Sequence, residues 1–414
     1  MAAPAATIAN LSAGLKRRYS TKFVSKIEWS KGAAAAMVPK VGWSGQPTWA
    51  MRVGNNGGGS ADFATAQTNG GAEITNIVQP VISTYQQDYG VATIEGRLMA
   101  AASDKEGALY DKMVAQIDGI MGGTMQSFAT KIYRSGFGEM SQISTSTTLA
   151  STSLVLKYPE DAVLFEIGMR IQFSSAISGA TLRNTGGTTD LRITAINYNT
   201  GTLTTSANIS SITGVATGDY IFRKGDRHDS ASTVRQAIVG FEGQFNMTDA
   251  IFGYTRSTDS RLQGVSIAST GKTEEDAIID GLAEVDRYGG QVDWVFMNPT
   301  RRRNLTKLAM GRYRPTTVAS PIPGVGVKGI NLMASSGDSV DIFSDPFCPV
   351  DRIYGISKES LQLFCARTSQ IPTFLDDDGN TVLRLAAADG IEGRVGYYAD
   401  LGCNAPIHNF CLTF

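Results

Sequence analysis

The alternation of hydrophobic and polar positions near the start of the chain is typical of strands. Segments 46–53 and 72–96 are rich in β-branched and aromatic side chains and flank a glycine-rich stretch, 54–71. No lysine lies in that stretch and we expect no helix to begin after it, so it does not fit a nucleotide-binding loop. We therefore predict a long two-stranded excursion with a soft tip.

The most regular helical pattern follows this excursion. Ser103 and Glu106 form a capping box. Hydrophobic residues then recur at steps of three to five, namely Leu109, Met113, Ile117, Ile120, Met125, Phe128 and Ile132. A helix of roughly 30 residues would extend about 45 Å. Within it, we expect a bend or a close backbone approach at Gly119, Gly122 and Gly123.

The composition shifts to Ser, Thr and Gly between residues 143 and 226, where short alternating runs are separated by turn signals such as Asn199-Thr200-Gly201. Short strands at even spacing predict a small antiparallel barrel or sandwich, inserted as a unit of its own.

The remaining chain mixes helix and strand. Segment 271–290 predicts a helix with Thr273 as N-cap, and segment 291–299 predicts a buried strand. Asn298 and Pro299 then cap and begin a second helix that ends at Gly311. Strands complete the chain, so we predict an α+β protein with an α/β sandwich in its second half.

Charge and hydropathy exclude several classes of protein. The net charge is -1, from 37 basic and 38 acidic residues, which gives no support to a DNA-reading role. No apolar window is long enough for a membrane helix or a secretory signal, so we expect no membrane association. The cysteines are expected to be buried small hydrophobes in a reducing compartment: Cys348, Cys365, Cys403 and Cys411.

Few residues could support catalysis. We expect His228 in an exposed polar loop and His408 as a hydrogen-bonded core or interface residue. Segment 324–329, GVGVKG, lacks the Ser or Thr of a P-loop, and segment 376–380, DDDGN, predicts a hairpin turn more than a calcium site. We therefore predict no enzyme activity, no cofactor and no metal.

Two basic features suggest contact surfaces. Residues 1–40 carry Lys16, Arg17 and Arg18 among other bases, which indicates an extended arm on a neighbouring surface or in solvent; a transit peptide stays an alternative. Arg301, Arg302 and Arg303 point in three directions on a helix, so a solvated or salt-bridged face is the default. A neighbouring subunit or packaged nucleic acid is the other interpretation.

The order of these parts resembles the major capsid protein of tailed bacteriophages, which has the Hong Kong 97-type fold. Herpesvirus shells and encapsulin nanocompartments share that fold. The segment VDWVFMNPTRRRNLTKL, 292–308, is similar to the strand and helix of the family's axial domain. Segments 252–264, 343–356 and 396–410 add to the likeness.

The resemblance implies a division of the chain into domains. We expect an N-terminal arm (1–45), an extended β-hairpin loop (46–98), a peripheral domain with the spine helix (99–142), an inserted small antiparallel β domain (143–226), a mainly axial domain (227–370) and C-terminal strands that return to the peripheral domain (371–414).

The resemblance also implies a function. It predicts a structural protein that self-assembles as hexamers and pentamers into an icosahedral or prolate virion shell around phage double-stranded DNA. Assembly would occur in the host bacterial cytoplasm, with a separate scaffolding protein and a portal as partners and non-specific DNA contact. Residues 41–104 contain no lysine for an isopeptide bond, so we predict a non-covalent shell.

Intersubunit contacts are expected at Lys16, Arg17, Arg18, Trp49, Arg52, Asn55, Asn56, Phe63, Arg301, Arg302 and Arg303. The alternatives are an encapsulin-like compartment shell, an α/β enzyme with a β insertion, and a tail-tube or adhesin protein.

Overall fold

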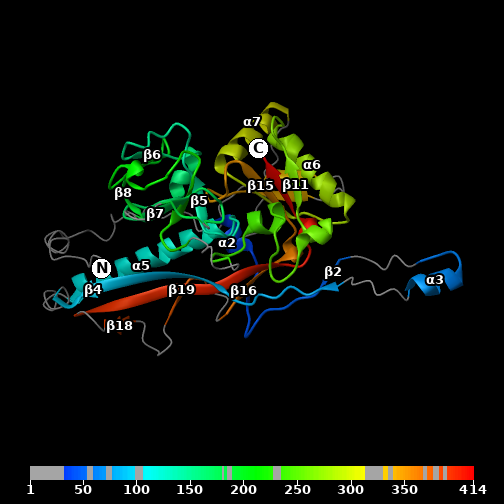
Figure 1. Cartoon of the computed structure of the whole chain (residues 1–414), viewed down its shortest axis with the longest axis horizontal. Helices are drawn as coiled ribbons and strands as arrows, with labels where there is room; N and C mark the ends of the chain where they lie inside the picture. The colour runs from blue at the N-terminus through cyan, green and yellow to red at the C-terminus, as the bar shows by residue number, and fades with distance from the viewer. Residues whose placement is uncertain are drawn as a thin grey trace.

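The chain forms a long base from which two lobes rise, and a narrow excursion leaves the base at one end (Figure 1). The computed structural model describes residues 32–53, 59–70, 77–97, 106–179, 181–183, 189–226, 235–312, 330–333, 339–366, 371–375, 382–385 and 389–414. The mixture of helices and sheets confirms the predicted α+β class.

The base is a six-stranded sheet covered by one long helix. Its longest strand, β19 (Gly390–Cys403), pairs antiparallel with β4 (Gln86–Glu95) in a register that runs from Gly390 opposite Glu95 to Ala399 opposite Gln86. The other strands of the sheet are β1 (Lys40–Gly42), β16 (Leu361–Cys365), β17 (Thr373–Phe374) and β18 (Val382–Arg384).

The covering helix, α5 (Glu106–Lys131), confirms the predicted spine helix. The close approach expected at its glycines lies elsewhere, because a Cβ at Gly119, Gly122 or Gly123 would meet nothing within 4 Å. It is Gly90 of β4 that admits the helix: a Cβ there would lie 2.3 Å from the Ile120 side chain. The glycine that brings helix and sheet together is therefore on the strand.

The first lobe is the predicted antiparallel barrel. Its strand order is β5-β10-β7-β8-β9-β6, and the bridge between Ile143 and Leu156 joins the ends of β5 and β6 and so closes the sheet. The strands are β5 (Glu139–Gln142), β6 (Ser153–Val155), β7 (Arg170–Ser174), β8 (Leu191–Asn197), β9 (Thr202–Thr205) and β10 (Tyr220–Arg223), with the 3-10 helix η1 (Pro159–Leu164) between β6 and β7.

The second lobe, called the axial lobe below, is an α/β sandwich. Its sheet has the order β11-β20-β15-β12-β14-β13. These strands are β11 (Val265–Ala268), β12 (Trp294–Met297), β13 (Ile330–Met333), β14 (Ser339–Ser344), β15 (Arg352–Ile356) and β20 (Phe410–Thr413).

Two helices cover this sheet. Helix α6 (Glu274–Arg287) begins as predicted, because the Thr273 side chain accepts a hydrogen bond from the Asp276 amide. Helix α7 (Pro299–Arg312) follows β12, and Asn298 Oδ1 accepts from the Thr300 amide at 3.0 Å. Both predicted helix starts are confirmed by these side-chain contacts.

The predicted domain boundary at residue 370 does not separate the strands of the base from those of the axial lobe. Strand β16 lies before that boundary but belongs to the base sheet, and β20 lies after it but sits inside the axial sheet. The pattern of a strand does not determine which strand it pairs with, so the sequence could not show that β16 joins the base sheet or that β20 joins the axial sheet.

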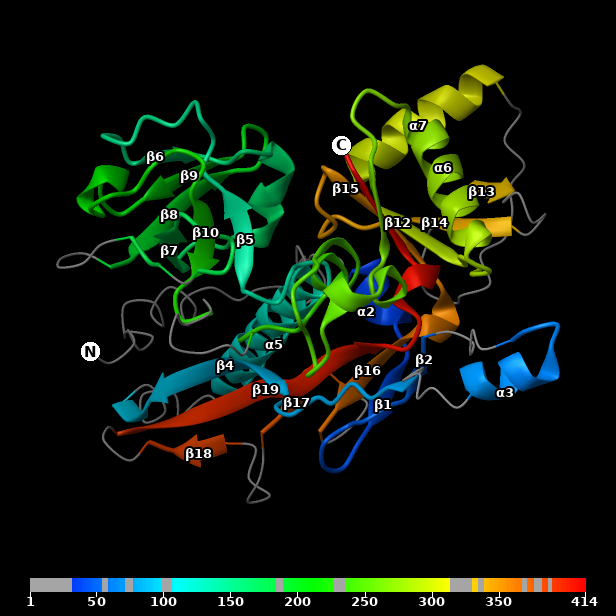
Figure 2. The ribbon, with the colours of Figure 1, turned by 45° about the vertical axis from the view of Figure 1, so that its right-hand side comes forward.

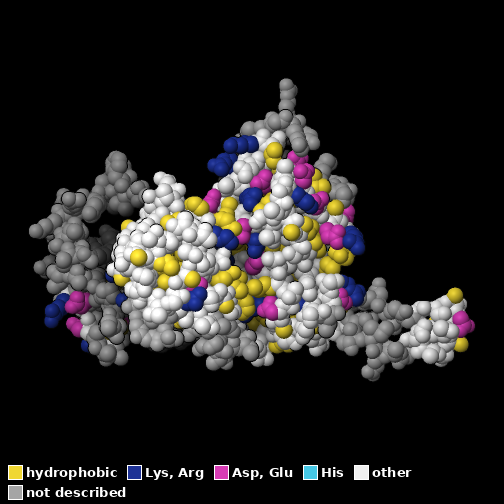
Figure 3. All heavy atoms as spheres, turned by 45° about the horizontal axis from the view of Figure 1, so that its top comes forward, with side chains coloured by type: hydrophobic (Ala, Val, Ile, Leu, Met, Phe, Trp, Pro, Cys, Tyr) yellow, Lys and Arg dark blue, Asp and Glu magenta, His cyan; other side chains and the backbone are white. Residues whose placement is uncertain are grey.

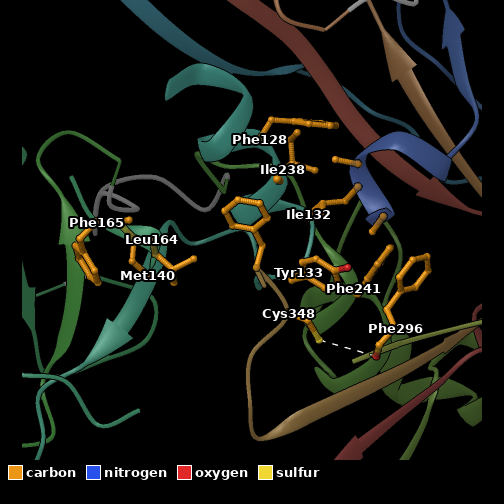
Figure 4. Packing of buried hydrophobic residues seen from close by; sticks show 14 of the residues in the cluster. Phe128, Ile132, Tyr133, Met140, Leu164, Phe165, Ile238, Phe241, Phe296 and Cys348 are labelled. Atoms are coloured by element: carbon orange, nitrogen blue, oxygen red, sulfur yellow. Dashed lines mark hydrogen bonds between the residues drawn. The ribbon is translucent and has the colours of Figure 1, made fainter. Parts of the chain in front are cut away.

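The core joins all three parts. Phe128, Ile132 and Tyr133 from the end of α5 meet Phe241 and Phe296 of the axial side, and residues of the barrel continue the same cluster (Figure 4). The four cysteines are buried as predicted, and burial raises the pKa of the Cys365 thiol to about 11. His408 is partly buried, which lowers its pKa.

Helix α2 (Ala33–Met37) is held in this core by a buried carboxylate. Asp345 Oδ2 accepts hydrogen bonds from the Ala34 amide at 3.2 Å and from the Tyr133 hydroxyl at 2.8 Å. The described start of the chain is therefore fixed beneath the axial lobe.

Candidate assembly surfaces

The base of the excursion is fastened to its own subunit. Strand β2 (Met51–Arg52) pairs antiparallel with β3 (Ile77–Val78), and Thr48 bridges to Val81. Trp49 stacks on Phe364 with ring centroids 5.5 Å apart, and its indole Nε1 donates to the carbonyl of Cys403 at 3.0 Å. Trp49, predicted as an intersubunit contact, thus packs within its own chain; its contact with a neighbour stays a prediction.

The tip of the excursion corrects one expectation. Instead of a tip without a helix, the glycine-rich segment leads into α3 (Phe63–Gly70). Asp62 begins this helix, because its Oδ2 accepts from the amide and the hydroxyl of Thr65 at 2.9 and 2.7 Å. Those bonds lower the pKa of the Asp62 carboxyl. Asp62, three residues before Thr65, is the sequence signal for this helix start, which was not predicted.

The side chains of α3 have little cover from their own subunit. The Phe63 ring is 81% exposed, and the described residues from 59 to 69 are exposed apart from Ala66, which is half-buried. Figure 1 shows α3 at the far end of the molecule, away from both lobes. An exposed aromatic ring on a projecting element is a feature of contact surfaces.

Several predicted contact residues lie outside the described residues: Lys16, Arg17, Arg18, Asn55 and Asn56. Arg52 lies in β2, where its backbone pairs with Ile77. The intersubunit contacts expected of all six residues therefore stay predictions.

The three consecutive arginines near the start of α7 have different surroundings. Arg301 is held inside the subunit: its Nη1 lies 3.2 Å from Glu274, its Nε donates to the Val350 carbonyl at 2.8 Å, and its guanidinium lies 4.0 Å from the centre of the Phe414 ring. Arg302 is half-buried, and burial lowers its pKa. Arg303 is exposed and available for contact.

The barrel is joined to the base by a buried group of four charges. Lys131 Nζ of α5 lies 2.9 Å from Asp88 of β4 and 3.2 Å from Asp226, and Arg223 of β10 lies 2.5 Å from Asp88 and 2.8 Å from Asp226. Ser127 also donates to Asp88 at 2.5 Å. This quartet links sheet, spine helix and barrel at one point.

The electrostatics of the quartet depend on its pairing. Burial by itself would raise the pKa of Asp88, but Lys131 and Arg223 outweigh it and hold the pKa below its usual value. Burial would lower the pKa of Arg223, but Asp226 and Asp88 keep it above its usual value. Asp88 and Arg223 therefore stay charged, and the removal of one member of the quartet leaves a largely buried charge without its full set of partners.

A second seam joins the barrel to the axial lobe around a cavity of about 170 Å³. Asp161 of η1 accepts from the Ser141 hydroxyl at 2.6 Å and lies 3.6 Å from Arg134. Burial raises the pKa of Asp161 and of Glu139, which line the same cavity. The sequence did not single out either seam, because the segments that meet there, such as those of Asp88 and Arg223 or of Tyr158 and Asp351, come together only in the fold.

The described residues contain no group of three or more His, Cys, Asp or Glu side chains arranged to hold a metal ion. In the same described part of the chain, no helix combines the length and apolar character that crossing a membrane requires.

No family model matches the chain, and no curated protein matches it by sequence. Solved structures do match. They are shells. The cyanophage A-1(L) capsid matches over 91% of this chain and 90% of its own, at 10% identity and a TM-score of 0.49. The capsid of the native GTA particle matches over 100% and 99%, at 10% identity and a TM-score of 0.47.

An encapsulin is matched over a smaller part. The holo-SrpI encapsulin of Synechococcus elongatus aligns with 37% of this chain and 57% of its own, at 12% identity and a TM-score of 0.27. The chain is thus similar to phage capsid proteins along most of its length. Because the identities and TM-scores are low, this likeness by itself does not establish what the chain does.

Proposed function

We propose that the chain is a major capsid protein of the tailed-bacteriophage type. It is a structural subunit that self-assembles as hexamers and pentamers into an icosahedral or prolate shell around double-stranded DNA. The shell forms in the cytoplasm of the bacterial host and becomes part of the virion.

The excursion is the observation that carries this proposal. Its base is packed by Trp49, but its tip holds Phe63 in solvent. Ordering a projecting segment costs about 1 to 2 kcal/mol per residue in backbone entropy. A neighbouring subunit that covers α3 would offset this cost, and contacts of this reaching kind, repeated around rotation axes, close a shell.

The rest of the architecture supports the same role. The base presents a long flat sheet, and the near-zero net charge suits a wall that must not hold its DNA tightly. The exposed Arg303 and the predicted contacts at Lys16, Arg17 and Arg18 would meet neighbouring subunits. A separate scaffolding protein and a portal complete the predicted set of partners.

Electron microscopy of the assembled protein tests the proposal directly. We expect closed shells built of pentamers and hexamers, and nuclease-protected double-stranded DNA in native particles. A protein cargo in place of DNA would indicate an encapsulin-like compartment, and a protein that stays monomeric at all concentrations and salt conditions would contradict the proposal.

A denaturing gel of the same particles tests the bonding between subunits. Since residues 41–104 contain no lysine, we expect a single band at the mass of one chain. A ladder of linked subunits would show that the shell is covalent.

A further inference from the structure

Helix α6 presents an acidic outer face to solvent. Its sequence holds Glu274, Glu275, Asp276, Asp280, Glu284 and Asp286 against a single base, Arg287. Glu274 is buried against α7, and the other acids lie nearer to the surface. Two of these acids are paired within the subunit, Asp280 with Lys272 at 2.7 Å and Glu284 with Arg287 at 2.9 Å. The four side chains are between 35% and 68% exposed, so the pairs stabilise the subunit little.

This acidic face has an apolar centre. Ile279 is 47% exposed, Ala283 lies one turn further along, and Tyr288 just after the helix is 42% exposed. An apolar centre with a polar rim is the arrangement found in protein interfaces. The exposed side of α6 therefore has the composition of a docking surface.

A groove of about 610 Å³ runs beside this face. Asp280, Ala283 and Glu284 of α6 line one side, and Val265 and Ile267 of β11 line the other. Strand β11 is the outer strand of the axial sheet and, within the described residues, pairs only with β20. The groove is wide enough for long side chains of a partner.

Helix α7 presents the opposite charge. Segment 299–312 contains Arg301, Arg302, Arg303, Lys307 and Arg312 and no acid. Arg303 and Lys307 are both exposed and, at a spacing of four residues, share one face of the helix. Figure 3 shows a group of Lys and Arg side chains at the upper edge of the axial lobe, whereas its other flank carries Asp and Glu side chains together with Lys and Arg.

The two helices lie on different flanks of the axial lobe. Helix α7 begins beside the barrel, where the Thr300 hydroxyl donates to Glu160 of η1 at 3.2 Å. Helix α6 lies on the side away from the barrel in both Figure 1 and Figure 2. A flank-to-flank contact between copies can therefore repeat in a ring, since each copy offers one surface of each kind.

We infer that the acidic face of α6 in one copy docks against the Arg303–Lys307 face of α7 in a second copy of this chain. The inference rests on the proposed function and names the contact by which axial lobes surround a rotation axis. Lys307 and Arg303 of one copy would lie near Asp280 and Glu284 of the next, around Ile279 and Ala283. Opposite charges there set the orientation of the contact and disfavour other pairings.

Charge reversal tests this contact. Asp280→Lys places two bases against each other at every contact, and Lys307→Glu places two acids, so each variant alone should assemble roughly tenfold less than the wild type at low salt. Light scattering and electron microscopy measure assembly, and urea unfolding checks that each subunit is folded. Lys358→Glu, an exposed reversal outside both helices, is the matched control and should assemble normally.

An equimolar mixture of the two variants gives the sharpest readout. In an alternating ring every contact again joins opposite charges, so we expect the mixture to assemble, with hexamers favoured because alternation needs an even number of copies. The double variant Asp280→Lys with Lys307→Glu should assemble alone for the same reason.

Assembly of the single variants at the wild-type level, or failure of both the mixture and the double variant, would overturn the inference and leave the proposed function standing. Failure of the wild type itself to form shells would instead reject the proposed function.

Discussion

The inserted barrel has a buried core that is continuous with the core of the rest of the subunit, whereas the tip of the excursion has none among its described residues. Phe165 of the barrel is fully buried, and Phe63 of the excursion is 81% exposed. The barrel is also fixed to the base by the quartet around Lys131, while the described contacts that fasten the excursion lie near its base, at Trp49 and the short strand pairs. Both parts project from the same base, but only the barrel buries its large apolar side chains such as Phe165 within the subunit, since Phe63 is left exposed.

This difference shows where the free energy of each part comes from. Burial of apolar surface within one chain stabilises the barrel before any assembly. If the proposed function holds, the tip of the excursion gains comparable burial from a neighbouring subunit, and its contribution then belongs to the assembly. Substitutions in the two parts should therefore act on different measurements.

A matched pair of phenylalanine truncations should give the largest contrast. Phe165→Ala should lower the free energy of unfolding of the subunit by about 3 to 5 kcal/mol, because it opens a cavity in a closed core. Phe63→Ala should change it by less than about 0.5 kcal/mol and reduce assembly instead. Urea denaturation of unassembled subunits and electron microscopy measure the two effects. Equal losses of stability would erase the contrast.

Removal of the central cation of the quartet should have the next largest effect. Lys131→Met leaves Asp88 and Asp226 with Arg223 alone, and we expect a loss of about 3 kcal/mol or more in unfolding free energy. Arg170→Met, which removes a largely exposed arginine and leaves its partner Asp190 paired with Lys224, serves as control and should cost less than about 1 kcal/mol. A Lys131 variant as stable as the control variant would show that the quartet does not anchor the barrel.

The pH dependence of stability should separate the folded base from the excursion. Burial raises the pKa of Asp400 in β19 to about 7, so the folded state holds a proton that the unfolded state has released above about pH 4. This group's contribution to stability is therefore lost as pH rises from about 4 to 7, by a few kcal/mol at most. Asp400→Asn should make the free energy of unfolding, measured by urea denaturation, less dependent on pH between about 4 and 7.

The stability of α3 should depend on pH in the opposite direction, falling as the pH falls. The pKa of Asp62 is lowered, so the stability it gives to α3 is present above its unfolded value and is lost as pH falls through the folded value. Circular dichroism of a peptide spanning 59–70 measures this, with Asp62→Asn as control. Helix content that rises as pH falls would contradict the capping role.

Excision of the tip should have the smallest effect on the subunit. Replacing residues 59–70 by a short Gly-Ser link should change the unfolding free energy by less than about 1 kcal/mol, since loop length costs little. Shell formation should be lost. If shells still form with normal hexamers and pentamers, the excursion is not the contact on which assembly depends.

Local patterns predicted the elements of this fold well. The Thr273 cap, the helix after Asn298 and the Ser- and Thr-rich barrel all follow from neighbours in sequence, and the structure confirms them. The pairing of β4 with β19 could not be predicted, because those strands are about 300 residues apart along the chain. Strand periodicity states which face is buried and leaves the partner open.

The candidate contact surfaces divide in the same way. The sequence indicated Phe63 and Arg303 as surface residues and did not show that Arg301 binds Glu274 or that Trp49 packs on Phe364. The quartet around Lys131 was not predicted either, because it forms only when three distant segments of the chain meet. Isolated charges in a sequence carry no record of whether they will be paired.

The first and last strands of the barrel are hydrogen-bonded neighbours, with Ser141 opposite Ile221 and Glu139 opposite Phe222. The chain therefore leaves the base and returns to it within about one strand spacing, near 5 Å. A short turn could span that gap, and so could another folded unit whose ends lie close together. The lobe is in this sense a cassette: one folded module could replace another there without a change in the path of the base.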